Sequence, residues 1–193
     1  MIIGIILLVV LLAIVVVLFI GPYNKLVGLR NKLQEAWRQV DVELNRRYDL
    51  IPSLVETVKG YAAHEQATFT AVLEARAKAT QVVIDADHLD AVSLKRFSAA
   101  QGELSSALSR LMAVSESYPD LKSSENFVML QSQLEGTENR IAVERKRFNE
   151  EINTYNSYIR GFPKNIIAQY HGFERRNYFE AEKEAEKAPN VSF

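Results

Sequence analysis

The hydrophobic pattern sets the start of the chain apart from the rest. Residues 2–20 are apolar at every position except Gly4, and no charged side chain occurs before Lys25. As an α-helix this run would be about 28 Å long, close to the ~30 Å hydrocarbon core of a bilayer. A cleaved signal peptide would have a basic start, a shorter apolar run and small residues before the cut, and Phe19-Ile20-Gly21 is a poor cleavage site. The pattern favours an uncleaved transmembrane anchor over residues 1–22.

Beyond this run, apolar positions recur with heptad spacing, which is typical of a helix packed along one face. One series is Leu26, Leu33, Val40, Leu54 and Tyr61, and it is interleaved with Trp37, Leu44, Ile51 and Val58. The exceptions on this seam are Arg30 and Arg47. Pro52 lacks the N–H that a helix interior needs, so we expect it to kink or restart the helix, with Gly60 near the end.

Three further helical patterns follow. The second helix is predicted over about residues 64–84, with Phe69, Val72, Leu73, Ala77 and Val83 toward the core. A polar turn at residues 85–90 leads to a third helix over about 91–117, whose seam is Phe97, Leu104, Leu108, Leu111 and Tyr118. Ser123 and Ser124 are candidate N-caps of a long fourth helix, which Gly161 and Pro163 would end. Its seam is Phe127, Leu130, Leu134, Ile141, Phe148, Ile152, Tyr155 and Ile159.

The last thirty residues predict a short helix over 164–172 and then a charged tail. We expect the aromatic residues of the tail, Phe173, Tyr178, Phe179 and Phe193, to dock onto the bundle. The ending Val191-Ser192-Phe193 has the form of a peptide that adds as a strand to a binding groove, but a tail packed on its own bundle is favoured.

The predicted fold class is therefore all-α, with a single N-terminal transmembrane helix followed by an antiparallel bundle of long helices. The predicted domains are residues 1–22 as the anchor, 23–162 as the helical bundle, and 163–193 as a short helix and C-terminal tail packed on the bundle. No segment has a strand pattern of any weight.

The charged residues predict the orientation of the anchor in the membrane. Lys25, Arg30 and Lys32 follow the apolar run before any acidic residue, whereas the other flank has no basic side chain. Because basic flanks stay in the cytoplasm, we expect a short N-terminus outside and a cytoplasmic body. Over the whole chain 23 basic and 24 acidic residues nearly cancel and are interleaved, which disfavours nucleic acid as a partner.

The sequence gives little support for chemistry. No cysteine is present, which excludes disulfides, zinc–thiolate sites and a lipidated cysteine. His64, His88 and His171 lie in separate segments without metal-ligand spacing, and no phosphate-binding or nucleophile-elbow motif occurs. We predict a protein that is not an enzyme, with no catalytic residue, cofactor or metal. The weaker alternative is a hydrolase that uses carboxylates on the bundle.

Arg47 is the most informative polar residue, because a guanidinium on an apolar seam needs charge partners if it is buried. An internal network that sets helix register is favoured over a binding site or partner contact. The candidate members of this polar network are Arg47, Asp49, Glu135, Glu138, Asn139 and Arg140.

Nearly the whole chain resembles the LemA family of small bacterial membrane proteins. The residues that carry the resemblance are Tyr23-Asn24-Lys25-Leu26 after the apolar run, Ala36-Trp37, Arg46-Arg47-Tyr48-Asp49-Leu50-Ile51-Pro52, Val58-Lys59-Gly60-Tyr61, Tyr118-Pro119-Asp120-Leu121-Lys122, residues 134–141, Tyr178-Phe179-Glu180-Ala181, Ala188-Pro189 and Val191-x-Phe193. The resemblance implies a helical bundle on the bacterial inner membrane, with its body inside. It implies links to envelope or membrane organisation, including magnetosome vesicles, and supplies no catalytic residues.

These observations lead to two functional hypotheses of different classes. The first is a non-enzymatic membrane scaffold, with the lipid bilayer and either a second copy or another membrane protein as partners. The second is an adaptor or regulatory subunit of a membrane protease or signalling enzyme. The resemblance points to a membrane metalloprotease as one such partner, because members of the family are often encoded near one.

Overall fold

The computed structural model describes residues 2–87 and 89–179, except for the side chains of residues 14–18. His88 and the Val191-Ser192-Phe193 ending lie outside the described residues. The elements are α1 (Ile2–Lys59), α2 (Gln66–Gln81), α3 (Ala91–Ser115), α4 (Pro119–Lys122), α5 (Glu125–Arg160) and α6 (Lys164–Tyr170). The described part contains no strand, and the prediction of an all-α protein is confirmed.

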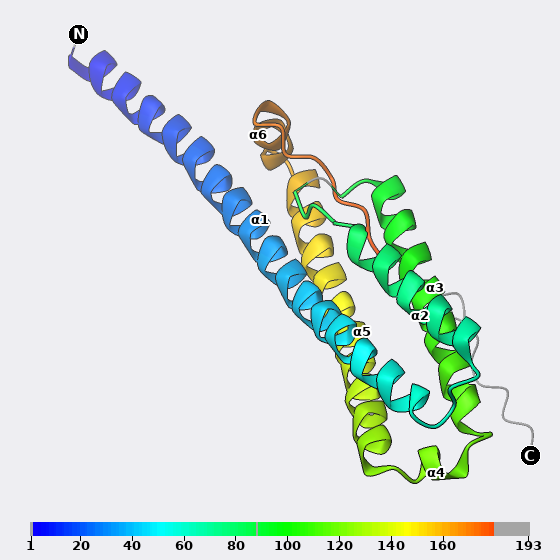
Figure 1. The fold of residues 1–193 in the computed structure, drawn as a ribbon. Helices are drawn as coiled ribbons and strands as arrows, with labels where there is room; N and C mark the ends of the chain where they lie inside the picture. The colour runs from blue at the N-terminus through cyan, green and yellow to red at the C-terminus, as the bar shows by residue number, and fades with distance from the viewer. Residues whose placement is uncertain (1, 88, 180–193) are drawn as a thin grey trace, which may run out of the picture.

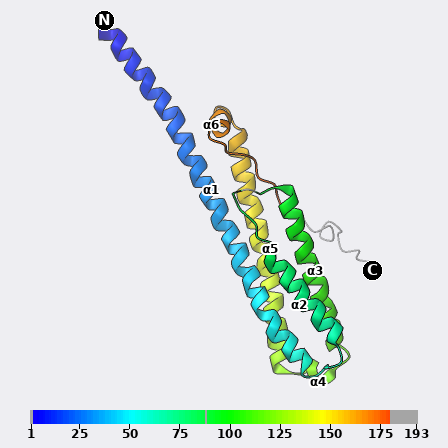
Figure 2. The same cartoon turned by 45° about the horizontal axis from the view of Figure 1, so that its top comes forward.

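The long helices form an antiparallel bundle. The second half of α1 packs along α5, and α2 packs against both α3 and α1. Figure 1 shows α1 continuing well beyond the bundle toward the N-terminus, and Figure 2 shows the same projection after rotation. Short α6 packs against both α1 and α5 where α1 leaves the bundle (Figure 1). Within the described part, which leaves out the side chains of residues 14–18, no helix combines the length and apolar character that crossing a bilayer requires.

The interior follows the heptad seams. On α1, every predicted seam residue from Leu26 to Val58 is buried, whereas Tyr61 lies beyond the helix and is exposed. On α5 the predicted seam is buried throughout, apart from Leu130, which is half-buried. On the third seam Phe97, Leu104, Leu108 and Leu111 are buried as predicted, whereas Tyr118, beyond the end of α3, is half-buried.

The second helix differs from its prediction. Phe69 and Val72 are buried as expected, but Leu73, Ala77 and Val83 are exposed. The core positions are instead continued by Ala75 and Ala79, at the three- and four-residue steps of a helical face. Val83 lies beyond the end of α2, so the helical periodicity no longer governs where it lies.

Pro52 does not restart the helix, because α1 runs unbroken through both Pro22 and Pro52. A proline at position 52 lacks the N–H that would otherwise donate to the carbonyl oxygen of Tyr48, four residues earlier. Arg76 of α2 supplies a replacement, since its Nε donates to the Tyr48 carbonyl oxygen at 2.7 Å. The expectation of a restart was wrong because a neighbouring helix satisfies the carbonyl that proline leaves free.

The helix ends show both expected and unexpected caps. Asp90 caps α3: its carboxylate accepts the backbone N–H groups of Val92 and Ser93 at 2.8 Å and the Ser93 hydroxyl at 2.6 Å. The hydrogen bond from the Ser93 hydroxyl is the main reason that the pKa of Asp90 is lowered. Ser124 occupies the N-cap of α5 without a side-chain cap bond. The single turn of α4, which begins at Pro119, was not predicted.

Candidate functional site

Arg47 lies at the centre of a polar group that joins three helices. Its side chain is 4% exposed, although it carries a full charge. The guanidinium donates to Gln101 Oε1 at 3.3 Å and to Ser105 Oγ at 2.8 Å, both on α3. It also pairs with Glu138 Oε2 of α5 at 3.1 Å. A buried guanidinium needs such partners, and here they come from two different helices.

Tyr48, the next residue along α1, extends the group to α2. Gln101 Nε2 donates to the Tyr48 hydroxyl oxygen at 2.5 Å, and that hydroxyl reaches the Ala79 carbonyl oxygen at 3.5 Å. Burial raises the pKa of Tyr48, while the hydrogen bond from Gln101 and the nearby Arg47 charge oppose that rise. All four long helices therefore contribute to one connected set of hydrogen bonds.

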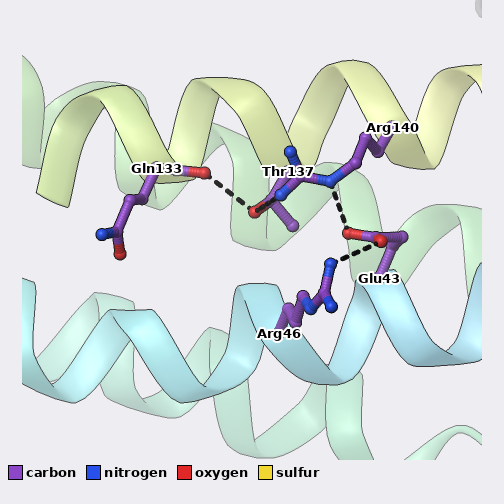
Figure 3. Close-up of polar contacts among 5 residues, drawn as sticks. All are labelled: Glu43, Arg46, Gln133, Thr137 and Arg140. Carbon is purple, nitrogen blue, oxygen red and sulfur yellow. Dashed lines mark hydrogen bonds and ion pairs between the residues drawn. The ribbon is translucent and has the colours of Figure 1, made fainter.

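A second ion-pair group lies one helical turn away on α1, around Glu43 (Figure 3). Glu43 is buried, and each of its carboxylate oxygens has a partner. Arg46 NH1 donates to Oε1 at 2.9 Å, and Arg140 Nε of α5 donates to Oε2 at 2.9 Å. Arg140 NH2 also donates to Thr137 Oγ1 at 3.0 Å, and Thr137 in turn donates to the Gln133 carbonyl at 2.8 Å (Figure 3).

The structure brings together some of the residues proposed from the sequence and separates others. Arg47 pairs directly with Glu138, and Arg140 belongs to the neighbouring Glu43 group. Asp49 and Asn139 are exposed. Glu135 is also exposed, and accepts a hydrogen bond from Gln131 on its own helix.

Six side chains of these groups are not among the residues proposed from the sequence: Glu43, Arg46, Tyr48, Gln101, Ser105 and Thr137. A signal was available for two of them, since Gln101 lies between Phe97 and Leu104 on one seam and Thr137 lies between Leu134 and Ile141 on another. A polar residue at a seam position is as informative on these helices as Arg47 is on the first. Glu43 and Ser105 lie beside their seams and carry no comparable signal.

Arg30, the other seam arginine, belongs to a separate polar group nearer the N-terminus. Its Nε lies 3.9 Å from Asp87 Oδ1, and Gln34 donates to Asp87 Oδ2 at 2.7 Å. Tyr155 of α5 is buried, and among the described residues its hydroxyl has no hydrogen-bond partner. Burial raises its pKa. Lys25 and Lys32, by contrast, are exposed on α1.

The C-terminal segment is held in extended form by two asparagines of α5. Asn149 donates to the Phe179 carbonyl at 3.1 Å and accepts its N–H at 2.9 Å. Asn156 makes the same pair of bonds with Arg176, at 2.8 and 2.9 Å. Seven helical residues and three extended residues each span about 10 Å, so the two amides match the two backbone positions. We call residues 173–179 with these two contacts the tail clasp.

An aromatic cluster lies where the tail clasp ends. The Phe179 ring is stacked on Trp37 of α1 with centroids 5.8 Å apart, and it also contacts Phe97 of α3 and Phe148 of α5 at 5.6 Å. Asn177 donates to the Leu89 carbonyl at 3.0 Å, which ties the segment to the chain before α3. Phe179 is buried as expected for a docked tail, whereas Tyr178 is exposed.

The two polar groups around Arg47 and Glu43 join side chains of different helices through ion pairs and hydrogen bonds. Arg47 pairs with Glu138, and Glu43 pairs with both Arg46 and Arg140. Within the described part, no group of histidine, aspartate and glutamate residues could hold a metal ion. A hollow of about 730 Å³ lies elsewhere, between the end of α5, α6 and the tail, with Ile159, Asn165 and Gln169 among its lining residues.

The family model described as LemA family matches residues 36–193, which include every residue of the Arg47 group, the Glu43 group and the tail clasp. The chain belongs to the LemA family. The resemblance seen in the sequence is thereby confirmed.

Curated relatives agree with this membership in the LemA family. Magnetosome protein MamQ of Magnetospirillum gryphiswaldense is 28% identical over 187 residues, covering 88% of this chain and 68% of the relative. Magnetosome protein MamQ 2 of Paramagnetospirillum magneticum has the same identity and coverage. Protein LemA of Metamycoplasma hominis is 26% identical over 151 residues, covering 78% of this chain and 65% of the relative. None of these names is that of an enzyme.

Proposed function

We propose that this LemA-family protein is a membrane-anchored, non-enzymatic scaffold that associates with a second copy or with another membrane protein. The observation that carries the proposal is the projecting part of α1. Its large apolar side chains from Ile2 to Leu12 are all about half exposed or more, and Phe19 and Ile20 are exposed as well. Consecutive positions cover every face of a helix, and a helix that is apolar all round requires an apolar environment.

The position of the basic residues supports one orientation. Lys25 and Lys32 are exposed on α1 just beyond the apolar run, and Arg30 is partly exposed beside Asp87. Under the positive-inside rule this flank stays in the cytoplasm, so we propose a single-pass protein of the bacterial cell membrane with its bundle inside.

The satisfied polar groups support a scaffold rather than an enzyme. Catalysis by Glu43 or Glu138 would require a carboxylate that is free to meet a substrate, but both Glu43 oxygens are bound to arginines and one Glu138 oxygen is bound to Arg47. The relatives named as magnetosome proteins support a role in organising membrane.

The anchor is tested by placing charge in the apolar run. Leu8→Arg together with Leu11→Arg should move most of the protein from the carbonate-resistant membrane fraction to the soluble fraction, since each central arginine costs about 2.5–3.5 kcal/mol of insertion free energy. The matched control is Val92→Arg with Val143→Arg, at exposed apolar positions of the bundle. Equal retention of both variants in the membrane would overturn the proposed anchor.

Crosslinking in intact membranes separates the two kinds of partner. A photoreactive amino acid in place of Val92 or Val143 samples exposed apolar positions on α3 and α5. Adducts with a second copy of the chain are expected for a self-associating scaffold. One dominant adduct with a foreign membrane protein would instead favour the adaptor, and a monomer without adducts from any exposed position would contradict both.

A further inference from the structure

The end of the bundle nearest the projecting part of α1 exposes three large apolar side chains. Phe162, Ile166 and Tyr170 are 81%, 53% and 84% exposed, and they follow one another at four-residue steps. The opposite side of α6 packs on the bundle, where Ile167 and Ala168 are buried. The short helix therefore has one apolar face packed on the protein and a second that nothing in the described part covers.

Aromatic contacts fix where this second face lies along α1. The Tyr23 ring lies 4.7 Å from the His171 ring and 6.1 Å from the Phe173 ring, measured between centroids. Tyr23 follows the last residue of the apolar run, Ile20, by three positions, which is about 4.5 Å along a helix. Both ribbon views place α6 at the end of the bundle where α1 departs (Figures 1 and 2).

The charge around α6 is basic. Residues 158–176 contain Arg160, Lys164, Arg175 and Arg176 but only one acid, Glu174. Exposed Lys25 adds a further positive charge on α1. Aromatic and aliphatic side chains beside lysine and arginine are the composition of helices that lie in the headgroup layer of an anionic bilayer.

We propose that Phe162 and the exposed face of α6 insert into the headgroup layer of the anionic membrane in which α1 is anchored. This inference rests on the proposed anchor, because α1 brings α6 to the correct depth. The face would act as a second attachment point, with Phe162, Ile166 and Tyr170 entering the interface and the neighbouring basic side chains contacting lipid phosphates. The bundle would then rest on the membrane surface by its α6 end.

The chain has no cysteine, so a single introduced cysteine reports from one position. Ile166→Cys carries an environment-sensitive fluorophore in the full chain, reconstituted in phosphatidylcholine vesicles with about 30% phosphatidylglycerol and a headgroup-labelled nitroxide lipid. Val128→Cys is the matched control, because it is similarly exposed near the other end of α5, about 50 Å away along the helix. Leu8→Cys reports on the anchor itself and is measured in parallel vesicles that carry the nitroxide on the lipid acyl chain, because a spanning helix would place position 8 within the hydrocarbon core.

The expected result is quenching at position 166 that is at least about twofold greater than at position 128, and greater with phosphatidylglycerol than without it. A quenched label at position 8 together with equal, weak quenching at 166 and 128 would overturn the proposal and leave the anchor standing. A blue shift at position 166 without nitroxide quenching would also overturn the proposal, because the label would then be covered by protein rather than by lipid. An unquenched label at 8 beside a quenched label at 166 would overturn the anchor and support surface docking.

Discussion

Single polar residues on the helix seams restrict how the helices of the bundle can be aligned with one another. Arg47, Gln101 and Thr137 occupy buried seam positions of the kind that apolar residues fill elsewhere on these helices, and each makes hydrogen bonds within the bundle. Buried polar groups cost free energy when unpaired, so a shifted helix register would leave Arg47 without partners. The sequence shows that Arg47 needs an acid, but which acid it meets depends on how α5 is aligned with α1.

Replacing Arg47 with methionine should lower the free energy of unfolding by about 2–4 kcal/mol, because it breaks the bonds to Gln101 and Ser105 inside the bundle. The Glu138 side chain is 49% exposed, so Glu138→Gln should cost less than about 1 kcal/mol. Urea unfolding of the detergent-solubilised protein measures both. Equal losses for the two variants would show that the ion pair, rather than the buried hydrogen bonds, dominates.

The hydrogen bond from Arg76 to the Tyr48 carbonyl should matter only while residue 52 is proline. Arg76→Met is expected to cost about 1–2 kcal/mol in the parent chain, because the Tyr48 carbonyl in this part-buried hydrogen bond loses its donor. In a Pro52→Ala background the new N–H of residue 52 meets that carbonyl, and the cost should fall below about 0.5 kcal/mol. A double-mutant cycle in urea measures the difference, and identical costs in both backgrounds would refute the compensation.

At the scale of elements, the sequence predicts the long helices well because their periodicity is strong. The observed α3 and α5 lie within about two residues of their expected bounds, as helix ends commonly do. The features that the sequence did not predict depend on contacts between elements, and these contacts cannot be inferred from the pattern of one segment alone. Arg76 keeps α1 continuous through Pro52, and the amide pairs of Asn149 and Asn156 are formed only when the tail folds back onto α5.

The chain reverses between α6 and the tail clasp at Gly172, whose φ of 71° suits glycine. The Phe173 N–H donates to the Ala168 carbonyl at 2.8 Å, a bond that closes the end of α6. The turn directs the following residues back along α5, where the two asparagines bind them.

Asn149→Ala with Asn156→Ala should release the tail clasp while leaving the helices folded. Amide hydrogen exchange at residues 176 and 179 is expected to rise by at least about tenfold, because both N–H groups lose their acceptors. Exchange in the centre of α5 should stay unchanged. The matched control is Asn153→Ala, an exposed asparagine on the same helix, and a similar rise in that variant would show that helix propensity, rather than the clasp, is responsible.

For the whole molecule, tyrosines that are buried (Tyr48 and Tyr155) or half-buried (Tyr158) predict how stability depends on pH. Burial raises the pKa values of Tyr48, Tyr155 and Tyr158 above the ordinary value of 10.0. The folded state therefore holds these protons more tightly than the unfolded state. Stability should be independent of these groups below about pH 10 and should fall as the pH rises above it.

Tyr155→Phe tests this dependence at one site. The hydroxyl has no hydrogen-bond partner among the described residues, so its removal should change the unfolding free energy at pH 7 by less than about 1 kcal/mol. Above pH 10 the variant should lose stability less steeply than the parent. Thermal melts in detergent between pH 7 and pH 11 measure both effects, and parallel curves would contradict the assignment.

The unbroken course of α1 has a mechanical consequence. A helix of 58 residues is about 87 Å long, and it has no joint at Pro22 where the apolar run gives way to the bundle. If the apolar run lies in a bilayer, the bundle is joined to it by one continuous helix. A change in the tilt of α1 would then change the orientation of the whole bundle, and a rotation of α1 about its axis would rotate α5 with it. Bilayer thickness, which sets the tilt of a spanning helix, would then determine how the bundle is presented to its neighbours.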